Sequence, residues 1–425
     1  MHRNQVLIVI IMALFFFSSP SFIAATERES LTLEQALSLA LGQNPELSAS
    51  IAEIQAREAG IIQARSLPNP EAELKTENIY GNKDRTGFTS AESTFSLGQT
   101  IELAGKRSKR TNIAALDRDL AKWDFDGKTL DVILEVRKSF IDVLSEQERV
   151  RLQEELVKVA EQSFTTVSAR VLAGKVSPID ETRASAALSL VKIDLERARR
   201  SLDSARNKLS ALLGEKSPSS FTAAGSLDVG SPVPEYGELL KRIYGNPDIA
   251  RWKNESEQRS MALDLEKAKR IPDPVITGGV KRFSENQENT FLAGISFPLP
   301  IFNTNKGSIL AAQKRLTKAQ EEKKAAILKA QTALSDAYLT LSSSFAEATS
   351  LKANVIPALQ NAHDSIYEGY RFGKFGFIDV LDAQRGLFEA KVKYIDSLGA
   401  YKKADANIKR LTGAFLKNEQ GEKEK

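Results

Sequence analysis

The sequence contains no cysteine and only two histidines among its 425 residues. The missing cysteine excludes disulfides, thiolate metal sites, cysteine nucleophiles and an acylated N-terminal cysteine. His363 is the only histidine beyond residue 25, and protein metal sites need several convergent His, Cys or carboxylate ligands. No such spacing occurs. We therefore expect no enzyme activity, no bound metal ion and no cofactor.

A large charge excess and a long apolar run are also missing. Lys and Arg total 59 against 55 Asp and Glu, a balance that argues against a nucleic-acid partner. The longest apolar run, Val6 to Phe17, would span about 18 Å as a helix, against a hydrocarbon core of roughly 30 Å. It follows His2-Arg3 and precedes Ala25, so residues 1–25 are typical of a cleaved signal peptide. We expect an exported chain without a transmembrane helix.

Glycine and proline are missing from unusually long stretches. Residues 128–173 contain neither, and apolar side chains such as Val132, Val136 and Phe140 recur at helical spacing. We predict long helices over about 106–173, 179–213, 306–371 and 377–415, with a local kink at Pro357. A helix of about 65 residues is roughly 100 Å long, so the protein is predicted to be elongated.

The same sequence motifs occur twice in the same order, about 200 residues apart. Pro68-Asn69-Pro70 returns as Pro272-Asp273-Pro274, and Asn44-Pro45 returns as Asn246-Pro247. Such a period is too long for a solenoid unit and indicates a duplicated half-molecule. In each half a first helix, about 31–66 or 236–271, ends at the prolines. The predicted organisation is a signal peptide (1–25), a first repeat (26–214), a linker (215–235), a second repeat (236–415) and a polar tail (416–425).

Each repeat also contains two strand-like segments, about 71–80 and 92–103 in the first and 274–283 and 289–301 in the second. In 92–103 and 289–301 apolar side chains alternate with polar or small ones, as in transmembrane β-barrel strands. The segment 71–80 places its charged side chains on one face, which suits a watery lumen, and 274–283 is poorly patterned. The residues predicted to face lipid are Phe95, Leu97, Ile101, Leu103, Phe291, Ile295, Phe297 and Leu299. Four strands cannot close a barrel, so three copies would supply twelve. The alternative is a soluble four-stranded sheet packed on helices.

Two charged features allow a functional interpretation. Lys106, Arg107, Lys109 and Arg110 begin the first long helix, where cations would lie near anionic headgroups or simply in solvent. The second feature is a pair of interhelix turns, each followed by an aspartate: Gly174-Lys175 with Asp180, and Gly373-Lys374 with Asp379 and Asp382. In a trimer Asp379 and Asp382 would form a ring of carboxylates that favours cations. The alternative is that glycine and acidic residues merely serve helix ends.

Over essentially its whole length after residue 25, the chain resembles the TolC family of outer-membrane efflux channels. The segments 67–71 and 99–107 are most similar to the CzcC-type heavy-metal branch. The resemblance implies a mainly α-helical trimer, with a long coiled-coil tunnel and four strands per chain in a twelve-stranded barrel. It further implies the outer membrane of a Gram-negative bacterium, a large periplasmic portion, and two partners, a periplasmic adaptor and an inner-membrane RND pump. The protein would be a passive conduit that exports heavy-metal cations.

The family's turn motif matches here as Tyr370, Gly373 and Asp379-Val380-Leu381-Asp382. By resemblance, Asp379 and Asp382 line the periplasmic aperture, Asp180 and Tyr370 help to hold it shut, and the adaptor docks at Gly174, Lys175, Gly373 and Lys374. Phe375 stands where channels like TolC have an arginine. Two alternatives stay open: a drug-efflux or type I secretion channel, and a soluble periplasmic coiled-coil scaffold.

Overall fold

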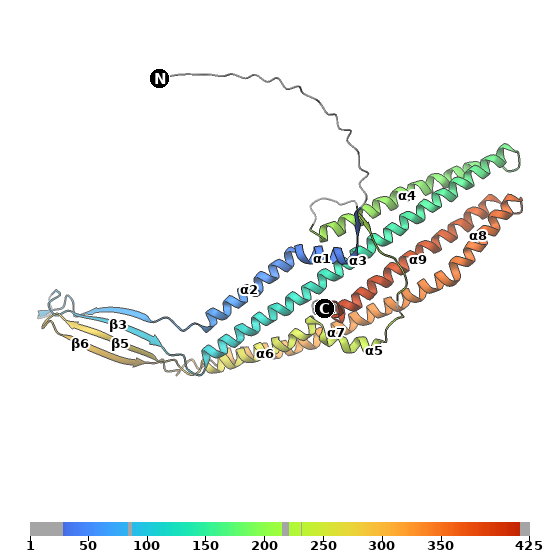
Figure 1. The fold of residues 1–425 in the computed structure, drawn as a ribbon. Coiled ribbons are helices and arrows are strands. Elements are labelled where there is room, and N and C mark those ends of the chain that lie inside the picture. Colours follow the sequence, from blue (N-terminus) through green and yellow to red (C-terminus); the bar gives the residue numbers. More distant parts are fainter. Residues whose placement is uncertain (1–28, 84–86, 215–220, 231, 417–425) are drawn as a thin grey trace, which may run out of the picture.

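The computed structural model describes residues 29–83, 87–214, 221–230 and 232–416, and shows an elongated helical rod with a small sheet at one end (Figure 1). The predicted signal peptide and all but the first residue of the predicted tail lie outside these ranges. The two interhelix turns lie at the end of the rod opposite the sheet (Figure 1). The predicted elongated, mainly helical architecture is confirmed.

The long helices of the two repeats run side by side along the rod. They are α3 (Lys106–Leu172) and α4 (Pro178–Leu212) in the first repeat, and α7 (Lys306–Ser350), α8 (Ile356–Arg371) and α9 (Phe377–Leu411) in the second. The irregularity expected at Pro357 is a π-helical turn, Leu351–Val355, that joins α7 to α8. Proline lacks a backbone N–H and crowds the preceding turn, so the α-helical ladder is interrupted just before it.

The first helix of each repeat is broken, and the prediction of single helices over 31–66 and 236–271 was wrong. The elements are α1 (Leu33–Gln43) and α2 (Pro45–Arg65), then α5 (Tyr236–Arg242), a 3-10 turn (Ile243–Gly245) and α6 (Pro247–Ala268). Asn44 accepts hydrogen bonds from the amides of Glu46 and Leu47 at 2.8 and 3.2 Å. Proline disfavours a helical residue before it and asparagine is a preferred N-cap, so each Asn-Pro pair begins a new helix.

Four antiparallel strands form one sheet in the order β2-β3-β5-β6, so the hairpin of one repeat lies beside that of the other (Figure 1). They are β2 (Glu71–Glu77), β3 (Glu92–Thr100), β5 (Val275–Phe283) and β6 (Asn289–Ser296). β6 ends before Pro298, which cannot donate to a strand ladder, and β2 ends before Asn78, whose φ is 58°. β2 and β6 are the edge strands of this sheet.

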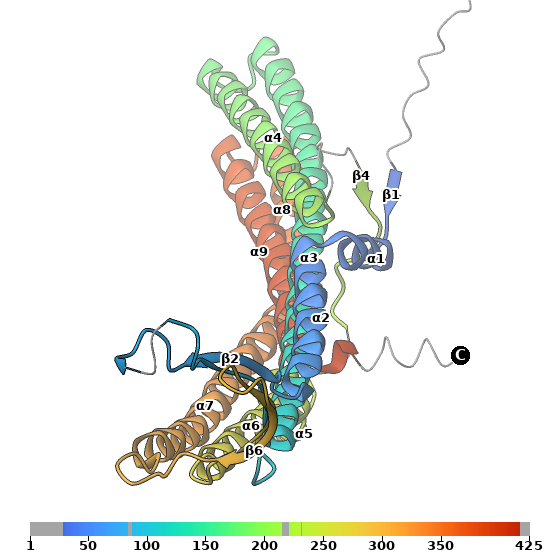
Figure 2. The same ribbon diagram turned by 90° about the vertical axis from the view of Figure 1, so that its left-hand side faces the viewer.

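A second, two-stranded sheet was not predicted. β1 (Glu29–Leu31) pairs in parallel with β4 (Phe221–Ala223), which lies within the predicted linker (Figure 2). The side chain of Gln147 on α3 bonds both backbone groups of Ala223, at 2.8 and 3.1 Å. The linker is thereby fixed against the first repeat.

The apolar core is divided along the rod rather than gathered at one centre. Val136, Val143 and Leu209 are fully buried where α3, α4 and β4 meet. Leu334 and Leu341 are buried in the corresponding cluster of α5, α7 and α9. Each such side chain contributes about 1.5–3 kcal/mol through burial. Three further buried clusters contain residues of both repeats, so the repeats are also stabilised by each other.

Candidate functional site

The two interhelix turns have the same backbone structure. Gly174 and Gly373 donate to the carbonyl three residues earlier, and Lys175 and Lys374 donate to the carbonyl five residues earlier, at 2.8–3.0 Å. Their glycines have φ of 68° and 75°, a left-handed conformation that disfavours other residues. All four residues are exposed. The rod therefore ends in two matched helix hairpins.

Asp379 and Asp382 are exposed near the start of α9. Asp379 lies three residues after Gly376, the N-cap of α9, and accepts a hydrogen bond of 2.8 Å from its amide, so it caps the helix by reaching back to its first residue. Asp382 forms an exposed ion pair of 3.3 Å with Arg385. In the first repeat, Asp180 forms a similar pair of 3.4 Å with Arg183. A capping role and an outward-facing charge are compatible, since the cap uses one carboxylate oxygen.

Tyr370 is only 2% exposed and joins the two hairpins. The guanidinium of Arg170 on α3 lies 4.6 Å from the centre of the Tyr370 ring and donates a hydrogen bond to the backbone carbonyl oxygen of Tyr370. Burial raises the pKa of the Tyr370 phenol, the charge of Asp180 raises it further, and Arg170 opposes both. The structure thus places Asp180 near Tyr370. Sequence reasoning missed Arg170, whose only signal was its place four residues before Gly174.

Phe375 takes part in packing within its own hairpin. A Cβ atom at Gly369 would come within 2.4 Å of the Phe375 ring, so the ring lies directly over this glycine. The position that resembles an arginine site in related channels therefore holds an aromatic contact on α8. A glycine at 369 is required for this close approach.

The eight residues predicted to face lipid are all exposed in the single chain. Phe95 on β3 is opposite Leu74 on β2 and Val280 on β5, and Val280 is opposite Phe291. Residues directly opposite share a face of the sheet, so these four form one apolar row. Leu74 and Val280 were not predicted, because β2 is marked mainly by its charged face and β5 alternates poorly, and the strand register reveals them.

The four-residue basic cluster at the start of α3 is largely engaged within the chain. Lys106 is buried and binds Asp273 and the carbonyl of Ile271, at 2.8 and 2.5 Å. Arg110 forms two bonds with Glu102 of 2.6 and 3.1 Å. Lys109 donates to the carbonyl of Ala104, and Arg107 is exposed. Contact with lipid headgroups stays a prediction, and Arg107 is the member best placed for it.

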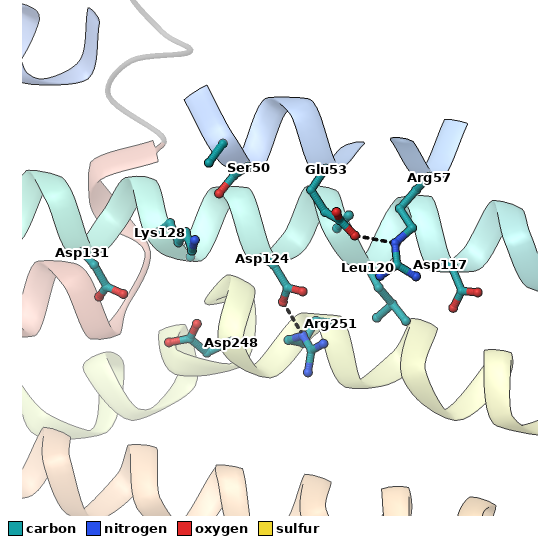
Figure 3. A pocket seen from close by; sticks show the side chains of 13 residues that line it. Ser50, Glu53, Arg57, Asp117, Leu120, Asp124, Lys128, Asp131, Asp248 and Arg251 are labelled. Carbon is teal, nitrogen blue, oxygen red and sulfur yellow. Dashed lines mark hydrogen bonds and ion pairs between the residues drawn. The ribbon is translucent and has the colours of Figure 1, made fainter. Parts of the chain in front are cut away.

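A cleft of about 620 Å³ lies between α2, α3 and α6 (Figure 3). Five carboxylates line it, and each has a partner: Glu53 with Arg57, Asp124 with Arg251, Asp117 with Gln258, and both Asp131 and Asp248 with Arg410. Burial raises the pKa of Asp117. Since its carboxylates form these bonds within the chain, we interpret the cleft as part of the interface between the two repeats.

Among the residues that the structure describes, no group of three or more His, Asp or Glu side chains is placed to hold a metal ion. A search of the same residues finds no helix that is both long and apolar enough to span a membrane.

Comparison with known proteins covers nearly the whole chain. The model of the outer membrane efflux protein family matches residues 36–215 and 241–414, one match per repeat. The cobalt-zinc-cadmium resistance protein CzcC of Cupriavidus metallidurans is 38% identical over 90% of each chain. The outer membrane protein TolC of Escherichia coli is 24% identical over 89% of this chain and 80% of its own. A solved membrane protein from Pseudomonas aeruginosa has a TM-score of 0.75 at 18% identity and covers 91% of both chains.

Proposed function

Because the chain belongs to the outer membrane efflux protein family, we propose that it is the exit duct of a tripartite efflux system that exports heavy-metal cations. It is an outer-membrane protein of a Gram-negative bacterium, and its helical rod forms a large periplasmic portion. In this role the protein catalyses no reaction, and an inner-membrane RND pump supplies the energy.

The observation that carries this proposal is the sheet at one end of the rod. It has two edge strands, an apolar face that includes Phe95 and Phe291, and an opposite face with Glu71, Glu73 and Lys75. An open sheet with unpaired edges is not tolerated in lipid. Three copies would close twelve strands into a barrel with an apolar exterior and a polar lumen.

The proposed cargo rests on similarity to CzcC, whose name describes cobalt, zinc and cadmium resistance. Asp379 and Asp382 support a cation pathway, since both are exposed near the tip of the rod and three copies would bring six carboxylates there. We assign the periplasmic aperture to Asp379, Asp382, Asp180 and Tyr370. The matched turns at Gly174-Lys175 and Gly373-Lys374 are the proposed docking surface for the periplasmic adaptor.

The test is survival of a deletion strain on graded zinc, cobalt and cadmium, with and without the gene restored, beside the same series with antibiotics and detergents. We expect sensitivity to the metals alone. Sensitivity to antibiotics alone would instead indicate a drug-efflux channel, and a secretion defect without either would indicate a type I secretion channel. Extraction of membranes with carbonate tests the remaining alternative, because a soluble scaffold washes off and a barrel protein does not.

A further inference from the structure

The internal duplication allows contacts between two copies to be deduced from contacts within one chain. If three chains close into a ring of six similar repeats, each boundary between chains repeats the boundary inside a chain. The inner boundary is the pairing of β3 with β5, and the outer one joins β6 to β2 of a second copy. This step rests on the proposed trimer.

Equivalent positions in the two hairpins follow from the proline motifs and the observed register. Glu73 and Thr277 each lie three residues after the second proline, at Pro70 and Pro274. Their partners across the hairpins are Ser96 and Gly294, so these two are equivalent. Lys75 and Gly279 each lie five residues after those prolines and are likewise equivalent.

Within the chain, Ser96 is directly opposite Gly279. We propose that Gly294 of β6 lies directly opposite Lys75 of β2 in a second copy of this chain, in antiparallel pairing. Ser296 then lies opposite Glu73 of the second copy, and Leu292 lies opposite Glu77. Both edges are ready for such pairing, since β2 and β6 are exposed along nearly their whole length.

The inner and outer boundaries differ in where the glycine of this pair stands. A Cβ atom at Gly279 would come within 2.4 Å of the Phe95 carbonyl and 2.8 Å of the Ser96 Cβ, so the inner boundary needs glycine there. In the deduced outer pair Lys75 takes the place of Gly279 and Gly294 takes the place of Ser96. Gly294 removes the Cβ contact on the opposite strand but not the carbonyl contact, so the two strands lie slightly farther apart at Lys75 than at Gly279.

The tilt of the strands from the barrel axis gives a check on the deduced register, because the tilt was not used to deduce it. One row of directly opposite residues crosses the sheet through Glu73, Ser96, Gly279 and Leu292. With the deduced pairing it reaches Glu77 of the next copy, four residues farther along β2 than where it began. Three copies advance by about 12 residues, or about 41 Å, around twelve strands spaced about 4.8 Å apart. The resulting tilt is about 35°, within the range of transmembrane barrels.

The same symmetry predicts a polar contact between chains that is weaker than its equivalent within each chain, the ion pair of Lys106 with Asp273; both are called latches below. Lys106 and Lys306 are both the first helical residue after a left-handed N-cap, and Asp273 is equivalent to Asn69. Lys106 is buried against Asp273, whereas Lys306 and Asn69 are exposed in the single chain. Lys306 of one copy therefore meets Asn69 of the next, where an amide replaces the carboxylate. The ring alternates between ionic and neutral latches.

Disulfide trapping tests the register, because the chain has no cysteine of its own. Glu73→Cys with Ser296→Cys should form covalent dimers and trimers in the outer membrane on a non-reducing gel. The matched controls are Ser296→Cys with Glu71→Cys or with Lys75→Cys, whose Cβ atoms would be displaced by about 7 Å, beyond disulfide reach. Cross-linking in a control pair but not in the first pair would overturn the register.

Asn69→Asp tests the latch independently. It should convert three neutral latches into ion pairs and raise the temperature at which trimers dissociate in mild detergent. Adding Lys306→Gln should remove the gain. An unchanged dissociation temperature, or a gain that survives Lys306→Gln, would overturn the latch. Trimers without the predicted disulfide would refute only the register, whereas monomers at every temperature would also refute the trimer in the proposed function.

Discussion

At the scale of single residues, the two aspartates of the proposed aperture have different structural roles. Asp379 uses one oxygen to cap α9, and Asp382 makes only an exposed ion pair. Exposed pairs contribute little to stability, typically below 1 kcal/mol. The side-chain oxygen of an asparagine at 379 can accept the same bond from the Gly376 amide, so both charges can be removed without breaking the hairpin.

We therefore predict that Asp379→Asn with Asp382→Asn lowers cation selectivity in single-channel recordings by several-fold and weakens block by trivalent cations. The effect should be largest at low salt, because charges are screened beyond about 10 Å at 0.1 M. The matched control is Asp194→Asn with Glu196→Gln, two acids on α4 that pair with exposed arginines of the same helix. Unchanged selectivity in the tip variant would remove these aspartates from the aperture.

A second residue-scale prediction concerns Asp126 on α3, where burial raises the pKa of the carboxyl. Below the unfolded pKa of 3.8 the group is neutral in both states, and stability is lost as pH rises through the raised folded value. Asp126→Asn should therefore raise the melting temperature of the purified protein at pH 7, with a smaller gain at pH 4. Asp228→Asn, at an exposed position, is the control. A gain of equal size at both pH values would contradict the burial argument.

At the scale of elements, Arg410 joins three helices where the two repeats meet. Its side chain is 15% exposed and binds Asp131 on α3 and Asp248 on α6. Arg410→Met would leave two unpaired carboxylates, so we predict a loss of roughly 2–3 kcal/mol in unfolding free energy, reduced from the fully buried case because both partners are half exposed. Lys409→Met, which removes only an exposed i,i+4 pair, should cost below about 0.5 kcal/mol. Thermal unfolding followed by circular dichroism measures both variants. Equal losses of unfolding free energy would show that Arg410 does not stabilise the contact between the repeats.

The long helices were predictable because they depend on local pattern, whereas other elements depend on contacts. The absence of Gly and Pro between 128 and 173 was enough to predict most of α3. The break at Asn44-Pro45 was readable from capping chemistry but was masked by continuous apolar spacing. β1 and β4 are three residues each and form only because distant segments meet. Lys106 looked like a surface cation, since sequence alone could not show that Asp273 lies beside it.

At the scale of the whole molecule, the two ends of the rod have opposite chemistry. One end is a sheet with an exposed apolar face, suited to lipid, and the other is a pair of matched, exposed turns bearing lysines (Figure 1). The long helices separate these two ends along the whole rod, so the ends can be altered separately. A lesion at either end should therefore disable a different step of export.

We predict that a four-residue Gly/Ser insertion after Lys374 abolishes metal resistance while trimers still form in the outer membrane. Lengthening this turn displaces the exposed surface proposed for the adaptor, whereas the contact between Tyr370 and Arg170 precedes it in the chain. The same insertion after Lys83, in the loop between β2 and β3 at the other end, should leave resistance intact. Survival on zinc and cobalt measures export, and mild detergent gels measure assembly. Full resistance with the lengthened turn would place adaptor docking elsewhere on the rod, because a contact that depends on matched turn geometry cannot tolerate four added residues.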